Sequence, residues 1–127
     1  MRLRNLLLGL AALALPAMAQ AAGAPKGDPA RGEALVKTRC SICHSTVVDT
    51  TPRPAPTQKG VVGRKAGTVV NFKYSAALKA SGLTWTPANL DKFLTNPAAM
   101  VPGTFMVIAV PNPAERADII AYLATVK

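Results

Sequence analysis

The sequence predicts an all-α fold in which short helices are joined by long loops. Three dipeptides pair a helix-capping side chain with a proline that suits the first helical position: Asp28-Pro29, Thr86-Pro87 and Asn112-Pro113. No stretch shows the alternation of apolar and polar residues that is typical of a β-strand. Between Ser45 and Gly67 the chain carries three prolines and three glycines, too many for a regular element. Loops of this length in a small domain usually wrap around something.

Two helices are expected in the first two thirds of the chain. The first follows the cap at Asp28 and ends at Cys40. The second is short and spans Tyr74 to Ser81, where alanine and leucine are frequent, and it stops at Gly82.

Two further helices are expected nearer the C-terminus. One begins after Thr86, has apolar residues at helical spacing and runs to about Thr95, where Asn96-Pro97 predicts its end. The last begins at Asn112, with Glu115 three residues after the cap as in a capping box, and continues as an amphipathic helix.

The segment Cys40-Ser41-Ile42-Cys43-His44 indicates a c-type haem attachment site. Two thiols with two residues between them match the spacing of the haem vinyl groups when the segment is helical, and the adjacent histidine can reach the iron. The same Cys-x-x-Cys spacing also occurs in dithiol redox motifs and in zinc sites. A zinc site would need further ligands, but the chain has two cysteines and one histidine.

The N-terminus, residues 1–21, reads as a secretory signal peptide. Arg2 and Arg4 precede an apolar run and then small residues, and we expect cleavage after Ala19 or Ala21. The apolar run is shorter than the roughly 18 residues of a spanning helix. The remaining residues, 22–127, form one domain that we expect in the bacterial periplasm, without a membrane span.

The charge balance favours acidic partners over nucleic acid. The formal net charge is +9, and it falls to +7 when Arg2 and Arg4 are removed with the signal peptide. The remaining lysines and arginines are scattered singly, and an exported protein does not meet nucleic acid.

Several motifs in order resemble the class I cytochromes c, and the resemblance covers nearly all of residues 22–127. The matching segments are Gly32 with the Cys40–His44 motif, Pro56 with Gly60, Val62–Gly67, Phe72–Ser75, Gly82–Trp85, Leu90 with Leu94–Pro97, Val101–Met106 and Glu115–Leu123. The resemblance implies helices and long loops wrapped around one covalently bound haem c, attached through Cys40 and Cys43.

The resemblance also implies the two metal ligands. His44 is the first, and Met106, which follows a Pro-Gly-Thr turn, is the second. Met100 is the other candidate for the second ligand, and a methionine near haem can also serve only to fill space in the core. A thioether opposite an imidazole favours ferrous iron and raises the reduction potential.

Four further cofactor-binding residues follow from the resemblance. Pro56 accepts a hydrogen bond from the histidine ring through its carbonyl, Tyr74 and Trp85 bond a buried haem propionate, and Arg64 offsets propionate charge. Each also has a purely structural interpretation: Pro56 as an ordinary loop proline, Tyr74 and Trp85 as core residues, and Arg64 as a solvated surface residue.

The chain departs from the family pattern at the pocket and on the surface. Phe93 and Leu78 stand where many relatives have tyrosine and asparagine, which makes the pocket more apolar and predicts a raised potential. Phe105 replaces a usual lysine, and with Val107 and Ile108 it forms an expected apolar docking spot. Scattered positive charge remains at Arg39, Lys59, Lys65, Lys73, Lys79 and Lys92.

The implied function is one-electron transfer by a soluble periplasmic carrier that is not an enzyme. We expect a monomer whose partners are redox proteins with acidic docking surfaces, such as a membrane oxidoreductase, a terminal oxidase or a periplasmic dehydrogenase. Two alternatives stay open: a cytochrome subunit of a larger oxidoreductase, and a haem-based ligand sensor or peroxidase, which would need an open iron position.

Overall fold

The computed structural model describes residues 26–48 and 51–127, so the expected signal peptide, residues 1–21, lies outside the described residues. The helices in chain order are α1 (Pro29–Leu35), a π-helical turn η1 (Val36–Cys40), α2 (Ala76–Ala80), α3 (Pro87–Thr95), α4 (Pro97–Met100) and α5 (Pro113–Leu123). Over these described ranges the backbone forms no β-strand, apart from one isolated antiparallel bridge between Lys65 and Thr84. The prediction of an all-α fold is therefore confirmed.

Three helices begin where the sequence predicts. Asp28 accepts hydrogen bonds from the first-turn amides of α1, and Thr86 and Asn112 do the same for α3 and α5, each followed by its proline. The capping box expected at Asn112 is not completed, because the Glu115 carboxylate instead binds the Arg39 guanidinium, with an oxygen 2.6 Å from Nη1. The stretch from Ser45 to Gly67 contains no helix among its described residues, as expected.

One helix boundary differs from the prediction, and one helix was not predicted. Helix α2 begins at Ala76 rather than Tyr74, because the Ser75 hydroxyl accepts a hydrogen bond from the Leu78 amide and caps it there. Asn96 ends α3, as predicted, but its side chain also accepts from the Ala99 amide at 3.1 Å and so caps α4. Helix α4 was not predicted because Asn96-Pro97, which indicates the end of α3, equally indicates the start of a helix.

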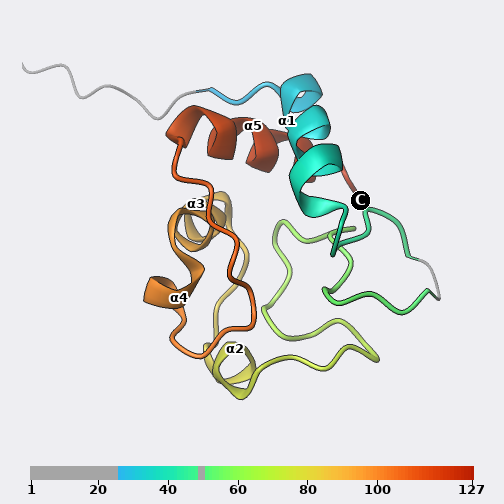
Figure 1. Ribbon diagram of the computed structural model, residues 1–127, viewed down its shortest axis with the longest axis vertical. Coiled ribbons are helices and arrows are strands. Elements are labelled where there is room, and N and C mark those ends of the chain that lie inside the picture. The colour runs from blue at the N-terminus through green and yellow to red at the C-terminus, as the bar shows by residue number, and fades with distance from the viewer. Residues whose placement is uncertain (1–25, 49–50) are drawn as a thin grey trace, which may run out of the picture.

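Helices α1 and α5 cross in close contact (Figure 1). A Cβ atom on Gly32 would collide with the carbonyl oxygen of Asp118, and one on Gly27 would collide with that of Ala117. An ion pair fastens the crossing: Arg31 Nε lies 2.8 Å from Asp118 Oδ2, and Asp118 Oδ1 also accepts from the Asp28 amide. The absence of side chains at the two glycines allows this approach.

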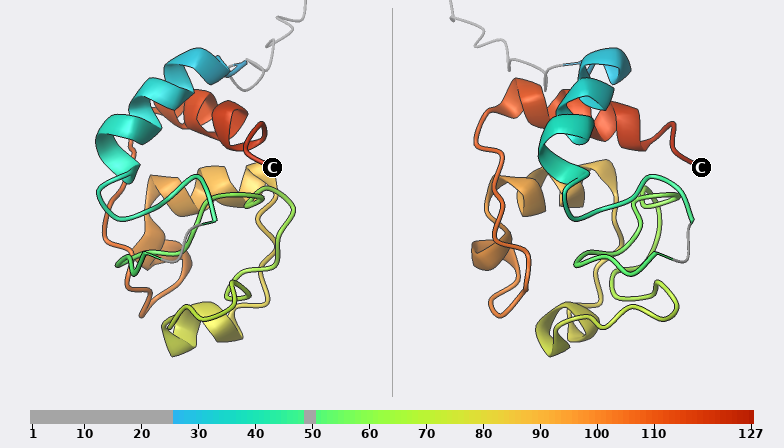
Figure 2. Two further views of the ribbon diagram at one scale, coloured as in Figure 1. Left: turned by 90° about the vertical axis from the view of Figure 1, so that its right-hand side faces the viewer. Right: turned by 45° about the vertical axis from the view of Figure 1, so that its right-hand side comes forward.

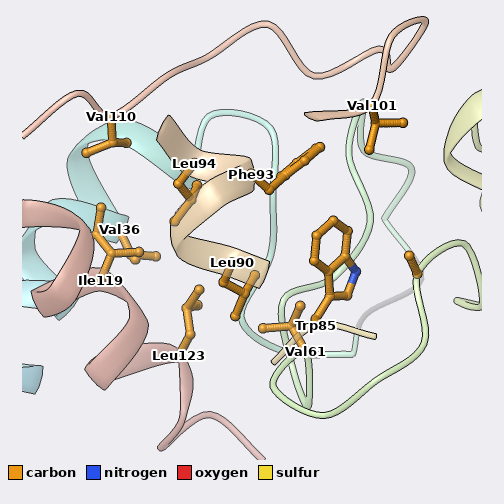
Figure 3. Packing of buried hydrophobic residues seen from close by; sticks show 11 residues of the cluster. Val36, Val61, Trp85, Leu90, Phe93, Leu94, Val101, Val110, Ile119 and Leu123 are labelled. Atoms are coloured by element: carbon orange, nitrogen blue, oxygen red, sulfur yellow. The ribbon is translucent and has the colours of Figure 1, made fainter. Parts of the chain in front are cut away.

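The hydrophobic core lies beneath this crossing (Figure 3). Val36 of η1 and Ile119 of α5 are each only 1% exposed, and they lie close together where the terminal helices meet. On the other side of α3, the rings of Phe93 and Trp85 pack with centroids 4.8 Å apart. The core therefore ties α1, α3 and α5 into one unit.

The remaining chain surrounds the centre of the molecule (Figures 1 and 2). The green loops after η1 lie on one side, and α3, α4 and the orange segment 101–111 lie on the other, with α2 at the far end from α1 and α5. In the part of the chain that the structure describes, no helix has the length and apolarity needed to cross a bilayer.

Candidate haem site

A cavity of about 320 Å³ opens between these two sides of the molecule. Its walls are mostly apolar and include Leu78, Leu90, Phe93 and Leu94. All eight site residues expected from the sequence line it: Cys40, Cys43, His44, Pro56, Arg64, Tyr74, Trp85 and Met106. They come from segments spread over more than half of the chain, so the fold brings together residues that the sequence separates.

The histidine ring is held by the loop opposite. Nδ1 of His44 lies 2.7 Å from the Pro56 carbonyl oxygen. Because a carbonyl only accepts, Nδ1 carries the proton, and the lone pair of Nε2 is left for a metal. Burial lowers the pKa of His44, the bond to Pro56 opposes this, and the Arg64 charge lowers the pKa further. The ring is therefore kept in the neutral form that ligates metals.

The loop that carries Pro56 is itself anchored to the motif. The amide of Ala55 donates to the Cys43 carbonyl at 3.2 Å, and the amide of His44 donates to the Cys40 carbonyl at 2.8 Å. These bonds fix the distance between the proline and the histidine through the backbone.

The two cysteines are free thiols: Cys40 is the last residue of the π-helical turn, and Cys43 lies three residues beyond it. The Val36 carbonyl accepts from both the amide and the hydroxyl of Ser41, which stabilises this wider turn just before Cys43. Burial raises the pKa of the Cys40 thiol, whereas a reactive dithiol needs a lowered one. Among the described residues no group of three or more His, Cys, Asp or Glu could hold a metal, which disfavours the zinc interpretation.

The wall opposite the motif carries Met106. A tight turn precedes it, in which the Thr104 amide donates to the Val101 carbonyl and Gly103 has φ +91°. The Thr104 hydroxyl then accepts from the Met106 amide at 3.3 Å and positions the residue at the cavity. Met100, the other candidate ligand, lines a separate hollow of about 270 Å³ and not the larger cavity. The geometry therefore favours Met106.

Polar side chains gather at one end of the cavity. Arg64 donates to the carbonyls of Lys59 and Thr57 at 2.7 and 2.8 Å, and its own carbonyl accepts from the Trp85 amide at 2.8 Å. The Tyr74 hydroxyl accepts from the Val69 amide, and burial raises the pKa of Tyr74. Tyr74 therefore keeps its proton and can donate to an anionic group.

Gln58 is among the cavity residues that the sequence did not single out. Its side-chain oxygen Oε1 is buried without a hydrogen-bond partner in the described part of the chain. A single glutamine in a loop of irregular sequence carries no signal that would single it out.

The residues that line the cavity are suited to binding haem c. Two free thiols are available for the vinyl groups, a neutral imidazole and a thioether are available for iron, and apolar walls end in a polar patch suited to propionates. The fold and this cavity together define a c-type haem protein.

A family model described as Cytochrome c matches residues 29–127, and the chain belongs to the cytochrome c family. It is 52% identical over 116 residues to cytochrome c2 of Rhodomicrobium vannielii, covering 91% of this chain and 89% of that protein. It is 46% identical to cytochrome c of Tetrahymena pyriformis, over 80% of this chain and 92% of that one.

Solved structures agree with this assignment. Cytochrome cH from Methylobacterium extorquens superposes with a TM-score of 0.71 at 44% identity, covering 78% of this chain and 99% of that one. Cytochrome c2 from Rhodospirillum centenum gives a TM-score of 0.74 at 36% identity, covering 80% and 99%. The protein is thus an electron-transfer protein of this family that carries haem c through Cys40 and Cys43.

Proposed function

We propose that this protein is a soluble periplasmic electron carrier whose haem iron is bound by His44 and Met106. The observation that carries the proposal is that these two side chains line one cavity from segments about sixty residues apart, with the His44 ring already oriented by Pro56. Haem c supplies a one-electron couple between ferric and ferrous iron. Two retained ligands leave no open coordination position, which suits a carrier and not an enzyme, a sensor or a peroxidase.

The polar end of the cavity supports a role in holding the haem propionates. Arg64 brings a positive charge whose pKa is lowered by burial, and Tyr74 brings a protonated hydroxyl. Trp85 is buried and lines the same cavity, where its indole N–H can serve as a donor. These three groups would offset or bond two carboxylates that are otherwise costly to bury.

The rim of the cavity supports a partner contact that is partly hydrophobic. Phe105, Val107 and Ile108, here called the apolar rim, are 70%, 82% and 54% exposed although they also line the cavity. The cations at Lys59, Lys65, Lys73, Lys79 and Lys92 are exposed around the molecule, whereas Arg39 is paired with Glu115. We expect an acidic redox partner that is steered by charge and held by the apolar rim.

The proposed location rests on the N-terminal sequence, and the proposed association state is a monomer. Residues 1–21 would direct export and be cleaved after Ala19 or Ala21, leaving a monomeric domain in the periplasm. Mass spectrometry of the protein isolated from periplasm tests the cleavage and the covalent haem together. A mass without haem would overturn the proposal.

Exogenous ligands test whether the iron is closed. The native protein should bind carbon monoxide in the ferrous state and cyanide in the ferric state slowly or incompletely, because Met106 must first leave. Rapid and complete binding would instead identify a sensor or peroxidase.

The alternative of a subunit in a larger oxidoreductase is tested by size. Gel filtration of the protein from its native source should give a small monomer. Elution as a stable large complex that retains reductase activity would favour the subunit.

A further inference from the structure

Arg116 is a buried cation that joins three segments of the chain. It belongs to α5, is only 8% exposed and does not line the haem cavity. Its Nε donates to Asp91 Oδ1 of α3 at 2.7 Å. Its Nη1 donates to the carbonyls of Val110 and Pro111 at 2.9 and 2.8 Å. One side chain therefore ties α5 and α3 to the segment 101–111, which carries Met106.

This segment is anchored on both sides of Met106. On the N-terminal side, the Thr104 hydroxyl accepts from the Met106 amide at 3.3 Å. On the C-terminal side, the next buried residue is Val110, and the residues between it and Met106 are exposed. The Val110 amide donates to the Leu94 carbonyl at 2.7 Å, close to the core (Figure 3), and the Val110 carbonyl accepts from Arg116. The second anchor of Met106 is therefore completed by Arg116.

Stability alone is a weak reason for a buried arginine at this place. Removing a guanidinium from water is costly, and the Asp91 side chain that balances its charge is 46% exposed, so solvent screens part of the attraction. Apolar side chains often replace buried ion pairs without loss of stability. What arginine supplies is a planar group whose nitrogens bond several acceptors in fixed directions. The arrangement therefore points to a role in fixing the positions of its acceptors.

We propose that Arg116 is a positioning residue that keeps the Met106 side chain in the cavity. By holding the Val110 and Pro111 carbonyls, it limits how far the exposed residues before them can move away from α3, and with them the thioether. This inference rests on the proposed function, in which Met106 is a metal ligand. The effect of Arg116 is transmitted through the backbone of the segment 101–111.

The test uses the complete haem-loaded protein and the variant Arg116→Lys. Lysine keeps the positive charge but lacks the planar group, so it cannot bond Asp91 and both carbonyls in the same geometry. We expect carbon monoxide to bind the ferrous protein about tenfold faster, because the loss of hydrogen bonds from a charged donor lets Met106 leave more often. In NMR spectra the Val110 amide should exchange faster with water, since its segment opens more often.

Two control variants separate positioning from a general loss of stability. Arg31→Lys makes the same exchange in another ion pair of α5, in which Arg31 Nε lies 2.8 Å from Asp118 Oδ2. Asp118→Asn removes the buried partner of that pair and should lower the denaturation midpoint further. Because this pair ties α5 to α1 and not to the segment of Met106, both controls should keep the wild-type carbon monoxide rate and Val110 exchange. Equal acceleration in the controls and in Arg116→Lys would overturn the proposal.

The outcomes distinguish this inference from the function on which it rests. If the wild-type spectrum lacks the signature of histidine and methionine ligation, the proposed function fails, and Val110 exchange still reports whether Arg116 anchors the segment. If the signature is present but Arg116→Lys binds carbon monoxide at the wild-type rate, the Arg116 proposal fails alone, even when the variant is less stable.

A second variant covers the case in which Arg116→Lys does not fold. Asp91→Asn leaves the arginine in place and weakens only its half-exposed partner. We expect carbon monoxide binding to be about threefold faster, because the guanidinium is held less firmly while its bonds to the two carbonyls remain. A wild-type rate in Asp91→Asn would then contradict the positioning role.

Discussion

The Nδ1 atom of His44 lies 2.7 Å from the carbonyl oxygen of Pro56, which is twelve positions later in the chain. This contact joins the helical attachment segment to a loop without regular structure. Because proline restricts its own backbone angle and that of the preceding residue, the acceptor is held in place before any ligand arrives. The orientation of the imidazole is therefore a property of the polypeptide.

Replacing Pro56 with alanine should loosen this acceptor while leaving a carbonyl at the position. We expect a loss of about 0.5–1 kcal/mol in the free energy of unfolding, since the unfolded chain gains freedom. In NMR spectra the Nδ1 proton of His44 should exchange faster with water. Pro52→Ala, an exposed proline of the same loop that does not line the cavity, should leave that exchange rate unchanged. Equal exchange in both variants would contradict the role of Pro56.

Removing the thioether of Met106 should open the iron. Met106→Ala is expected to bind carbon monoxide rapidly in the ferrous state and to lose potential, since the ligand that favours ferrous iron is gone. Met100→Leu is the control, because Met100 lines the separate hollow and not the haem cavity. Rapid carbon monoxide binding by Met100→Leu instead would reverse the assignment of the ligand.

The apolar wall should raise the potential. Phe93 and Leu78 both line the cavity, so the double variant Phe93→Tyr with Leu78→Asn brings a hydroxyl and an amide to it. Polar groups stabilise the more positive ferric haem, and we expect the midpoint potential to fall in a redox titration. The single variants should each account for part of the fall. A rise in potential for the double variant would count against this explanation.

The ion pair between α1 and α5 should make the stability of the folded protein depend on pH. Arg31 and then the Asp28 amide hold the pKa of Asp118 below its ordinary value, so the folded protein binds this proton less readily than the unfolded chain. The stabilisation is therefore present above the ordinary carboxyl pKa of about 4 and is lost as pH falls through the lower folded value.

Asp118→Asn tests this relation. The variant should be less stable than the wild type at neutral pH, and the difference in denaturation midpoint should shrink below about pH 4. Glu33→Gln, which breaks the exposed pair with Lys37, should change stability little at any pH. A difference for Asp118→Asn that stays constant down to pH 2 would argue against a depressed pKa.

The apolar rim should govern reaction with the partner when salt screens charge. Phe105→Ala is expected to slow electron transfer to isolated membranes several-fold at high ionic strength, because its contact does not depend on charge. Lys73→Gln should slow the reaction mainly at low ionic strength, where steering operates. Stopped-flow kinetics over a series of salt concentrations measures both. A rate that collapses in modest salt for the wild type would show that charge dominates.

The fold could be predicted where local signals decide it. Asp28, Thr86 and Asn112 mark helix starts because their side chains bond amides only two or three residues away. Asn96 misled the prediction because one residue serves two helices, and the same sequence fits an end and a beginning. The approach of Gly27 to Ala117 was missed since it depends on a packing partner ninety residues later.

The site could be predicted only with the family resemblance. The spacing of Cys40 and Cys43 and the adjacent histidine are local, and they can be read from five residues. Pro56, Arg64, Tyr74, Trp85 and Met106 are common residue types whose meeting in one cavity depends on the tertiary fold. Gln58 could not be predicted in either way, because its side-chain oxygen is distinguished only by having no hydrogen-bond partner among the residues that the structure describes.

The pairing of α1 with α5 also determines how late in synthesis α1 can reach its folded contacts. The amide of Asp28 bonds the side chain of a residue ninety positions later, so this contact of α1 cannot form until α5 has been synthesised. Cys40 is the last residue of η1, which directly follows α1. The contact between α1 and α5 is therefore one of the last long-range contacts that the growing chain can make.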